Sequence, residues 1–189
     1  MVGAIAIVAT VSACGDSEPD AGPEVPANDY CAPVDNWDSE LAAFEVEVLV
    51  LVNEARAEGA ICGTSDVYEP APALSMDPAL RCAARIHALD MATQDYFSNL
   101  DPEGLRYSDR AAMAGYEAFT RGQNIGAAHS SPEQLVVAVL GSPGLCRTLM
   151  DPDATDFGMG RVFAEGVEHS SYWTQVYGGP TSASDETGE

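Results

Sequence analysis

The sequence contains no lysine: its eight basic residues are all arginine, against 30 acidic residues in a chain of 189. The formal net charge at pH 7 is therefore −22. A chain this acidic cannot neutralise many phosphates, which excludes nucleic acid as a partner and excludes docking on an anionic lipid surface through charge. The acidic excess instead indicates a solvated extracellular surface.

The common motifs of metal and cofactor chemistry are also missing. No run has the spacing of an EF-hand loop, no CxxC pair is present, and there is no Walker or dinucleotide-binding fingerprint. Gly141-Ser-Pro-Gly144 lacks the spacing of a nucleophile elbow. Of three histidines, His87 falls on the apolar face of an expected helix and is predicted to be a core residue. His129 and His169 fall in loops, and a site joining His129 to Asp156 is conceivable, but no spacing specifies it.

The N-terminus carries an export pattern. Residues 1–13 are almost wholly apolar, too short to span a bilayer but suited to a secretory signal. Val11-Ser-Ala-Cys14 resembles a bacterial lipobox, in which Cys14 is lipidated and becomes the mature N-terminus. Because no Lys or Arg precedes the apolar run, cleavage after Ala13 without lipidation and a structural role remain alternatives. We expect a secreted protein or a cell-envelope lipoprotein that touches the membrane only through Cys14.

Four further cysteines after an export signal predict two disulfides. Three connectivities are possible. We favour Cys62 with Cys82, which closes a short loop and leaves Cys31 to pair with Cys146. A zinc site is the rival interpretation, and the missing CxxC pairs argue against it.

Composition divides the rest of the chain into three parts. Residues 14–29 form an acidic segment rich in Pro, Gly and Ala, which predicts a flexible tether. Residues 30–180 carry the apolar periodicity of one folded domain. Residues 181–189 are polar and are predicted to be a disordered tail.

Helical signals dominate the first part of the domain, and strand signals come late. Helices are expected over 39–58, from Asp77-Pro78, over 108–114, from the capping box Ser131-Pro-Glu-Gln134, and after Pro143. Strands are expected at 123–127, 157–164 and 171–177. Residues 46–52 also fit a strand, so periodicity alone leaves the first helix open. Together these elements predict an α+β layered domain.

Several motifs together resemble one known family. They are Val52-Asn-Glu-Ala-Arg56, Asp95-Tyr-Phe-Ser-Asn-Leu-Asp-Pro-Glu-Gly104, Gly122-Gln-Asn-Ile125, the stretch from Ser142-Pro-Gly-Leu-Cys146 to Thr155-Asp-Phe-Gly158, and Tyr172-Trp-Thr-Gln-Val-Tyr-Gly178. They resemble the CAP superfamily (cysteine-rich secretory proteins, antigen 5 and pathogenesis-related proteins), in its bacterial SCP-like branch. The resemblance implies an α-β-α sandwich around a small antiparallel sheet, and it favours a helix over 39–58.

The resemblance also implies a cleft lined by two histidines and two acidic residues. In this sequence the matching positions are Asn99, Gln123, Leu145 and Asp156. Amides are poor ligands for transition metals and do not exchange protons near neutral pH, and leucine can neither ligate nor donate. We therefore expect no metal and no cofactor at these positions, with Asn99 and Gln123 bonded to loop backbone or forming a polar remnant with Asp156.

These observations predict a non-catalytic extracellular module that binds an unidentified ligand or protein, with lipids and cell-wall components as candidate ligands. Two alternatives stay open. One is a peptidase or other hydrolase that uses Asp156 as its general base. The other is a structural envelope protein whose anchor and acidity matter more than its cleft.

Overall fold

The computed structural model describes residues 21–166 and 168–181, and the structural statements below concern those residues. The predicted export segment 1–13, the lipidation at Cys14 and the tail from residue 182 lie outside this part. Within it, no helix is both long enough and apolar enough to cross a membrane. The elements in chain order are η1 (Ala32–Val34), α1 (Ser39–Glu58), β1 (Ala60–Cys62), β2 (Asp66–Tyr68), β3 (Ser75–Met76), α2 (Pro78–Gln94), α3 (Tyr107–Ala114), β4 (Phe119–Ala127), α4 (Pro132–Gly141), α5 (Pro143–Leu149), β5 (Asp156–Phe163) and β6 (Ser171–Gly179).

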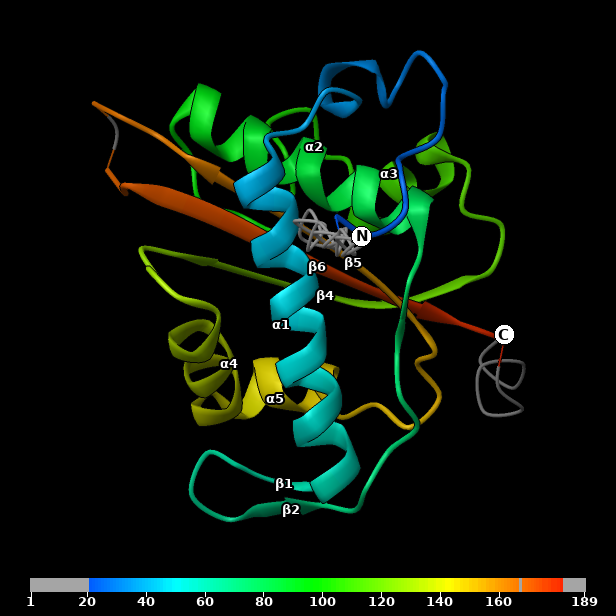
Figure 1. Cartoon of the computed structure of the whole chain (residues 1–189), viewed down its shortest axis with the longest axis vertical. Coiled ribbons are helices and arrows are strands. Elements are labelled where there is room, and N and C mark those ends of the chain that lie inside the picture. Colours follow the sequence, from blue (N-terminus) through cyan, green and yellow to red (C-terminus); the bar gives the residue numbers. More distant parts are fainter. Residues whose placement is uncertain (1–20, 167, 182–189) are drawn as a thin grey trace, which may run out of the picture.

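A sheet with the strand order β3-β5-β6-β4 forms the centre of the fold (Figure 1). β6 lies between β5 and β4 and pairs antiparallel with both. The predicted α+β class with a small antiparallel sheet is therefore confirmed for the three long strands. β3 adds two residues to the outer edge of β5 in parallel orientation. The sequence pattern did not reveal β3, because two residues are too few to show alternation.

Helices cover both faces of this sheet. α2 and α3 lie on one face, whereas α4 and α5 lie on the other, and α1 packs against α4 and β5 (Figure 1). Alternating side chains of β6 serve the two layers: Trp173 and Tyr177 pack in the core shared with α1, α4 and α5, whereas Val176 packs in the core shared with α2 and α3. This is the α-β-α sandwich that the resemblance implied.

Glycines in β5 allow α2 to lie directly on the sheet. A Cβ atom at Gly158 would come within 2.0 Å of the Leu80 backbone, and one at Gly160 within 2.3 Å of the Arg85 Cα. Phe157 and Met159, which alternate with these glycines, are fully buried on the opposite face. The alternation of glycine and larger residues seen in the sequence therefore reflects a close approach on one face and a packed core on the other.

Side-chain caps fix where the helices begin. The Asp38 carboxylate accepts hydrogen bonds from the backbone amides of Glu40 and Leu41, so α1 is a helix and the competing strand interpretation of 46–52 is wrong. Asp77 caps α2 in the same way, with Pro78 as the first helical residue. Ser131 Oγ accepts from the amide of residue 134 and caps α4.

Two polar residues of α1 attach this helix to its neighbours. The Asn53 amide donates to the carbonyl of Leu74 and accepts from its N–H. The fully buried Arg56 guanidinium donates to four carbonyl oxygens, those of Pro72, Leu149, Asp151 and Ala154. Free carbonyls at the end of α5 gain charged donors in this way. The motif Val52-Asn-Glu-Ala-Arg56 therefore positions α1 against the connection that precedes β5.

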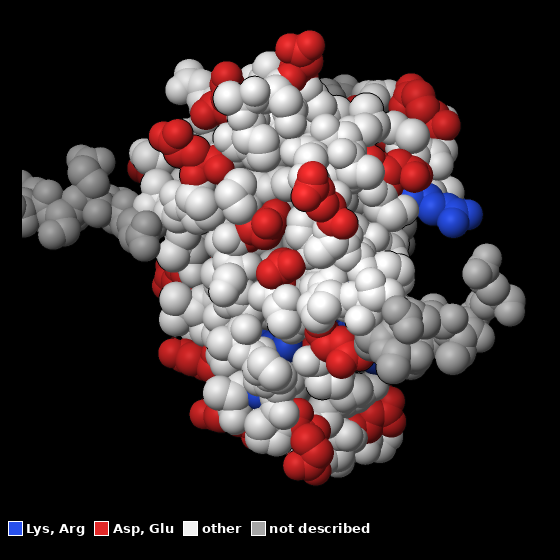
Figure 2. Space-filling model, turned by 90° about the vertical axis from the view of Figure 1, so that its right-hand side faces the viewer, with Lys and Arg blue, Asp and Glu red and all other residues white. Residues whose placement is uncertain are grey.

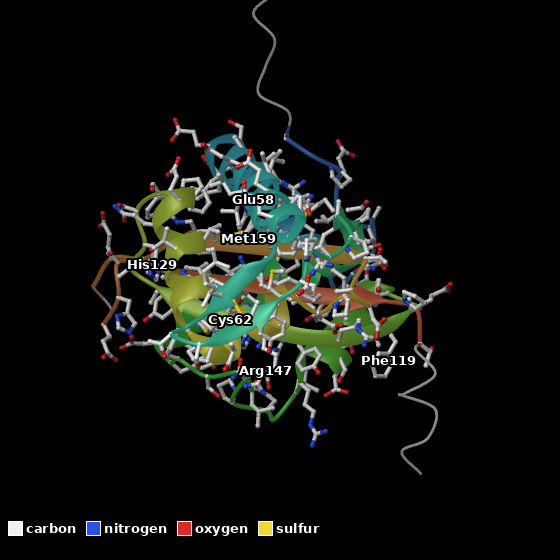
Figure 3. The ribbon with its side chains drawn as sticks, turned by 90° about the horizontal axis from the view of Figure 1, so that it is seen from below. Glu58, Cys62, Phe119, His129, Arg147 and Met159 are labelled. Carbon is white, nitrogen blue, oxygen red and sulfur yellow. A yellow bond between two sulfur atoms is a disulfide. The ribbon has the colours of Figure 1, made fainter. Side chains whose placement is uncertain are left out.

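The favoured disulfide pairing is wrong. Cys31 bonds to Cys82, with Cα atoms 5.7 Å apart, and Cys62 bonds to Cys146, with Cα atoms 5.4 Å apart. The reason is the layer to which each cysteine belongs. Cys82 lies in the α2 layer, whereas Cys62 lies on β1 in the core on the other side of the sheet (Figure 3). Closeness in sequence therefore could not bring Cys62 and Cys82 together.

Residues 21–28, which belong to the expected tether, lie against the domain. The Arg81 guanidinium is buried, and it donates to the Glu45 carboxylate at 2.8 Å and to the carbonyl of Pro23 at 2.7 Å. Val25 packs against the core of the α2 layer, and the Asn28 side chain donates to the Ala114 carbonyl. A buried guanidinium requires several hydrogen-bond acceptors. The Glu45 carboxylate also accepts from Arg85, so the Pro23 carbonyl supplies a further acceptor that Arg81 needs.

Candidate functional site

Two of the four candidate cleft positions meet. Asn99 lies in the loop between α2 and α3, and Gln123 lies on β4. The Gln123 side-chain N–H₂ donates to the Asn99 side-chain oxygen at 3.1 Å and to the Asn99 carbonyl at 3.3 Å. The Gln123 side chain therefore bonds loop backbone as expected, whereas the Asn99 side chain bonds the Gln123 side chain.

A third residue, Arg110 of α3, completes this cluster. Arg110 is 2% exposed and donates to the Leu105 carbonyl at 2.7 Å, the Asn99 carbonyl at 2.9 Å and the Gln123 Oε1 at 2.9 Å. The Asp101 carboxylate lies 3.7 Å from the same guanidinium. A guanidinium cation therefore lies beside the Asn99–Gln123 pair and donates to both residues. We refer to Asn99, Arg110 and Gln123 as the amide–guanidinium cluster.

Sequence reasoning missed Arg110, although a signal for it exists. Arg110 shares the buried face of α3 with Ala111 and Ala114, so a charged residue falls where the helical pattern expects an apolar one. A buried charge is costly unless it is bonded, which makes an arginine at such a position a candidate for a polar network.

His87 of α2 lies beside the cluster and is a core histidine, as predicted. Its ring is fully buried, and Nε2 donates to the Ser98 carbonyl at 2.9 Å. Burial, and then the nearby Arg110 charge, lower the pKa of His87 to about 4. The Tyr96 hydroxyl donates to Asp90 at 2.6 Å and lies 3.4 Å from His87 Nδ1. His87 is therefore neutral near pH 7 and fixed in orientation.

Asp156 begins β5 and has a different partner. Its Oδ2 accepts from the Tyr116 hydroxyl at 2.6 Å, and Oδ1 accepts from Thr155. Burial and the Asp156 carboxylate raise the pKa of Tyr116, so this phenol stays protonated and continues to donate. A Cβ atom at Gly178 would come within 2.1 Å of the Tyr116 oxygen, so glycine is required beneath this pair. Within the described chain, no hydrogen bond joins Asp156 to Asn99 or Gln123.

Leu145 belongs to the opposite side of the sheet. It lies on α5 and packs against the core that contains Phe157 and Tyr177. Its carbonyl accepts from the side chain of Asn124, the neighbour of Gln123 on β4. Because adjacent strand residues point to opposite faces, Leu145 and Gln123 are separated by the sheet. Among the described residues, hydrogen bonds therefore join only two of the four candidate positions, Asn99 and Gln123.

The two remaining histidines build no metal site. His129 Nδ1 accepts from the Trp173 indole N–H at 3.1 Å. His169 packs edge-on against Phe97 and Tyr172. His129 lies two residues after the end of β4, at the end of the sheet opposite Phe119 (Figure 3), whereas Asp156 pairs with Gly178 near the Phe119 end. In the part of the chain that the structure covers, no group of three or more His, Cys, Asp or Glu side chains could hold a metal ion.

Comparison with known proteins agrees with the fold and the motifs. Residues 49–177 match the cysteine-rich secretory protein family, CAP. The chain therefore belongs to this family. The uncharacterised protein YkwD of Bacillus subtilis (strain 168) is 29% identical over 139 residues, which cover 74% of this chain and 48% of the relative. The chain thus spans about half the length of that relative.

Solved structures show the same fold at low identity. An extracellular protein with an SCP domain from Bacillus anthracis str. Ames superposes with a TM-score of 0.57 at 23% identity, covering 70% of this chain and 39% of that one. An outer surface protein of Borrelia burgdorferi superposes with a TM-score of 0.58 at 16% identity, covering 71% and 90%. A cysteine-rich secretory protein of Staphylococcus aureus gives a TM-score of 0.51 at 16% identity, covering 70% and 37%.

Proposed function

We propose that this protein is an exported CAP domain that acts as a non-catalytic binding module outside the cell. The observation that carries this proposal is the amide–guanidinium cluster. Arg110 donates to the Asn99 carbonyl and to Gln123 Oε1, and Gln123 donates to Asn99 Oδ1, so both side-chain amide oxygens already accept a hydrogen bond. Because these oxygens already accept hydrogen bonds, the cluster has little remaining capacity to bind a metal or activate a water molecule.

The titratable groups nearby support the same proposal. General acid–base catalysis needs a group that exchanges protons near the working pH and can reach substrate. His87 is buried, with a pKa lowered to about 4 by burial and Arg110. Asp156 is bonded to Tyr116, which donates a hydrogen bond rather than removing a proton. His87 is therefore neutral near pH 7 and shielded from substrate, and the Asp156 carboxylate already accepts hydrogen bonds from Tyr116 and Thr155.

Export is supported by three independent features. Two disulfides join distant parts of the chain, and disulfides are typical of oxidising compartments. Two structural relatives are described as an extracellular protein and an outer surface protein. The sequence Val11-Ser-Ala-Cys14 supplies the pattern for a lipid anchor on Cys14. We propose that a lipidated Cys14 holds the domain at the cell envelope.

A turnover assay tests the non-catalytic claim. The purified full chain is incubated with peptide libraries and ester substrates, beside the variant Asp156→Asn and the matched control Asp35→Asn, which changes an exposed aspartate of the same charge. We expect no turnover from any of the three. Turnover that disappears in Asp156→Asn and persists in Asp35→Asn would establish the hydrolase alternative. For the anchor, Cys14→Ala should move the protein from the membrane fraction to the soluble fraction.

A further inference from the structure

A hollow of about 230 Å³ lies between α1 and α4, on the outer side of the molecule. Its floor is apolar, formed by Leu51 and Ala55 of α1 and by Val136 and Leu140 of α4. Val137 stands at its edge with 68% of its surface exposed. Exposed valines are ordinary when scattered, but this one continues an apolar floor that is already open to solvent.

A second hollow, of about 250 Å³, continues the first toward the β1–β2 hairpin. Glu58, which Figure 3 labels at the end of α1, lines both hollows. Ile61 and Val67 face each other across the hairpin and are 64% and 71% exposed. We call the two hollows together the α1–α4 groove. The part between α1 and α4 is mainly apolar, and the groove as a whole exposes the large hydrophobic side chains of Ile61, Val67 and Val137.

The rim of the α1–α4 groove is acidic. Glu54 and Glu58 stand one helical turn apart on α1, and Glu133 lies in the first turn of α4. Neither Glu54 nor Glu58 makes an ion pair with any residue that the structure describes. No arginine lines either hollow. The groove therefore combines apolar contact area with uncompensated negative charge.

The negative charge of the rim decides which kind of ligand fits the α1–α4 groove best. A fatty acid would place its carboxylate among glutamates and would find no cation to pair with. A second copy of this chain would bring another 22 net negative charges, and the acidic excess is visible over the face in Figure 2. A cationic partner is attracted both by the rim and by the field of the whole molecule.

Resting on the binding function proposed above, we propose that the α1–α4 groove binds a cationic amphipathic helix of another protein or peptide. The apolar face of that helix lies on Val136, Val137 and Leu140, and its Lys or Arg side chains reach Glu54, Glu58 and Glu133. Two neighbouring helices with a groove between them suit a third helix, which inserts side chains spaced by three or four residues.

The test uses a fluorescent amphipathic helical peptide built of Leu and Lys, titrated with the full-length protein and followed by anisotropy. A scrambled peptide of equal composition and an analogue with Glu in place of Lys are the ligand controls. Val137→Ser is compared with Met113→Ser, an exposed apolar residue on α3, and Glu58→Gln is compared with Glu103→Gln, a loop carboxylate. Each control removes the same kind of group away from the groove.

We expect saturable binding that Val137→Ser weakens roughly tenfold and Met113→Ser leaves unchanged, because a valine buried by the peptide loses its contact. Glu58→Gln should weaken binding about twofold and reduce its salt dependence, with no change for Glu103→Gln. Equal effects of groove and control variants, or preference for the Glu analogue or for palmitate, would overturn the groove proposal. Self-association that Val137→Ser abolishes would overturn it as well.

Mass spectrometry of the same samples separates this proposal from the one on which it rests. An intact peptide that fails to bind contradicts only the groove proposal. A peptide that is cleaved by the wild-type protein contradicts the non-catalytic function, whatever its affinity. An intact, bound peptide supports both.

Discussion

Replacement of Arg110 by methionine should destabilise the domain substantially. Methionine fills much of the same space but cannot donate to Asn99, Leu105 or Gln123, all of which Arg110 contacts within 2.9 Å. A net contribution of about 1.5–3 kcal/mol for each hydrogen bond from a charged donor would give about 4.5–9 kcal/mol for the three bonds. Asn99 is exposed, so water can replace part of this bonding. We therefore expect the free energy of unfolding to fall by about 3 kcal/mol.

Urea denaturation followed by circular dichroism measures this loss. Arg110→Lys keeps the charge but concentrates it on one nitrogen, which cannot reach three acceptors, so it should lose roughly half as much as Arg110→Met. Arg147→Met, an exposed arginine on α5, is the matched control and should change stability by less than about 0.5 kcal/mol. A loss below about 1 kcal/mol in Arg110→Met would refute the role assigned to the amide–guanidinium cluster.

Three further predictions concern the scaffold. Gly158→Ala should cost more than about 2 kcal/mol or prevent folding, because its Cβ would meet the α2 backbone at 2.0 Å. Gly144→Ala, where nothing lies within 4 Å, should leave thermal stability unchanged or raise it by up to about 1 kcal/mol. The pKa of His87 is about 4 in the folded state against 6.5 ordinarily, so the unfolded state binds this proton first as pH falls. The contribution of neutral His87 to the free energy of unfolding is complete above about pH 6.5 and falls by up to about 3 kcal/mol as the pH drops to about 4. In His87→Gln, urea denaturation at several pH values should show a smaller loss of stability over this pH range. Peptide mapping without reduction should recover Cys62 linked to Cys146, and no peptide in which Cys62 is linked to the cysteine of α2.

Local signals were sufficient to predict most elements of this fold. Asp77-Pro78 and Ser131-Pro132 predicted helix starts because capping depends on neighbouring residues only. The glycines of β5 predicted a strand, and the structure shows that they face α2. Caps and alternation are properties of a few adjacent residues, so the sequence displays them directly.

Contacts between residues that are far apart in the sequence were not predictable in the same way. The disulfide pairing depends on which side of the sheet Cys62 and Cys82 occupy, and nothing near either residue encodes that. Arg110 joins a loop, a helix and a strand, so its role emerges only when all three are placed. Leu145 matched a cleft position by motif, but α5 places it in the opposite layer.

The central claim is that the amide–guanidinium cluster leaves no working metal or catalytic site, and a zinc titration tests it most directly. Isothermal titration calorimetry of the full-length protein, freed of metal by a chelator, should show only weak heat from dispersed surface carboxylates, unchanged in the double variant Asn99→Ala with Gln123→Ala. Tight one-to-one zinc binding that this double variant abolishes would contradict the account.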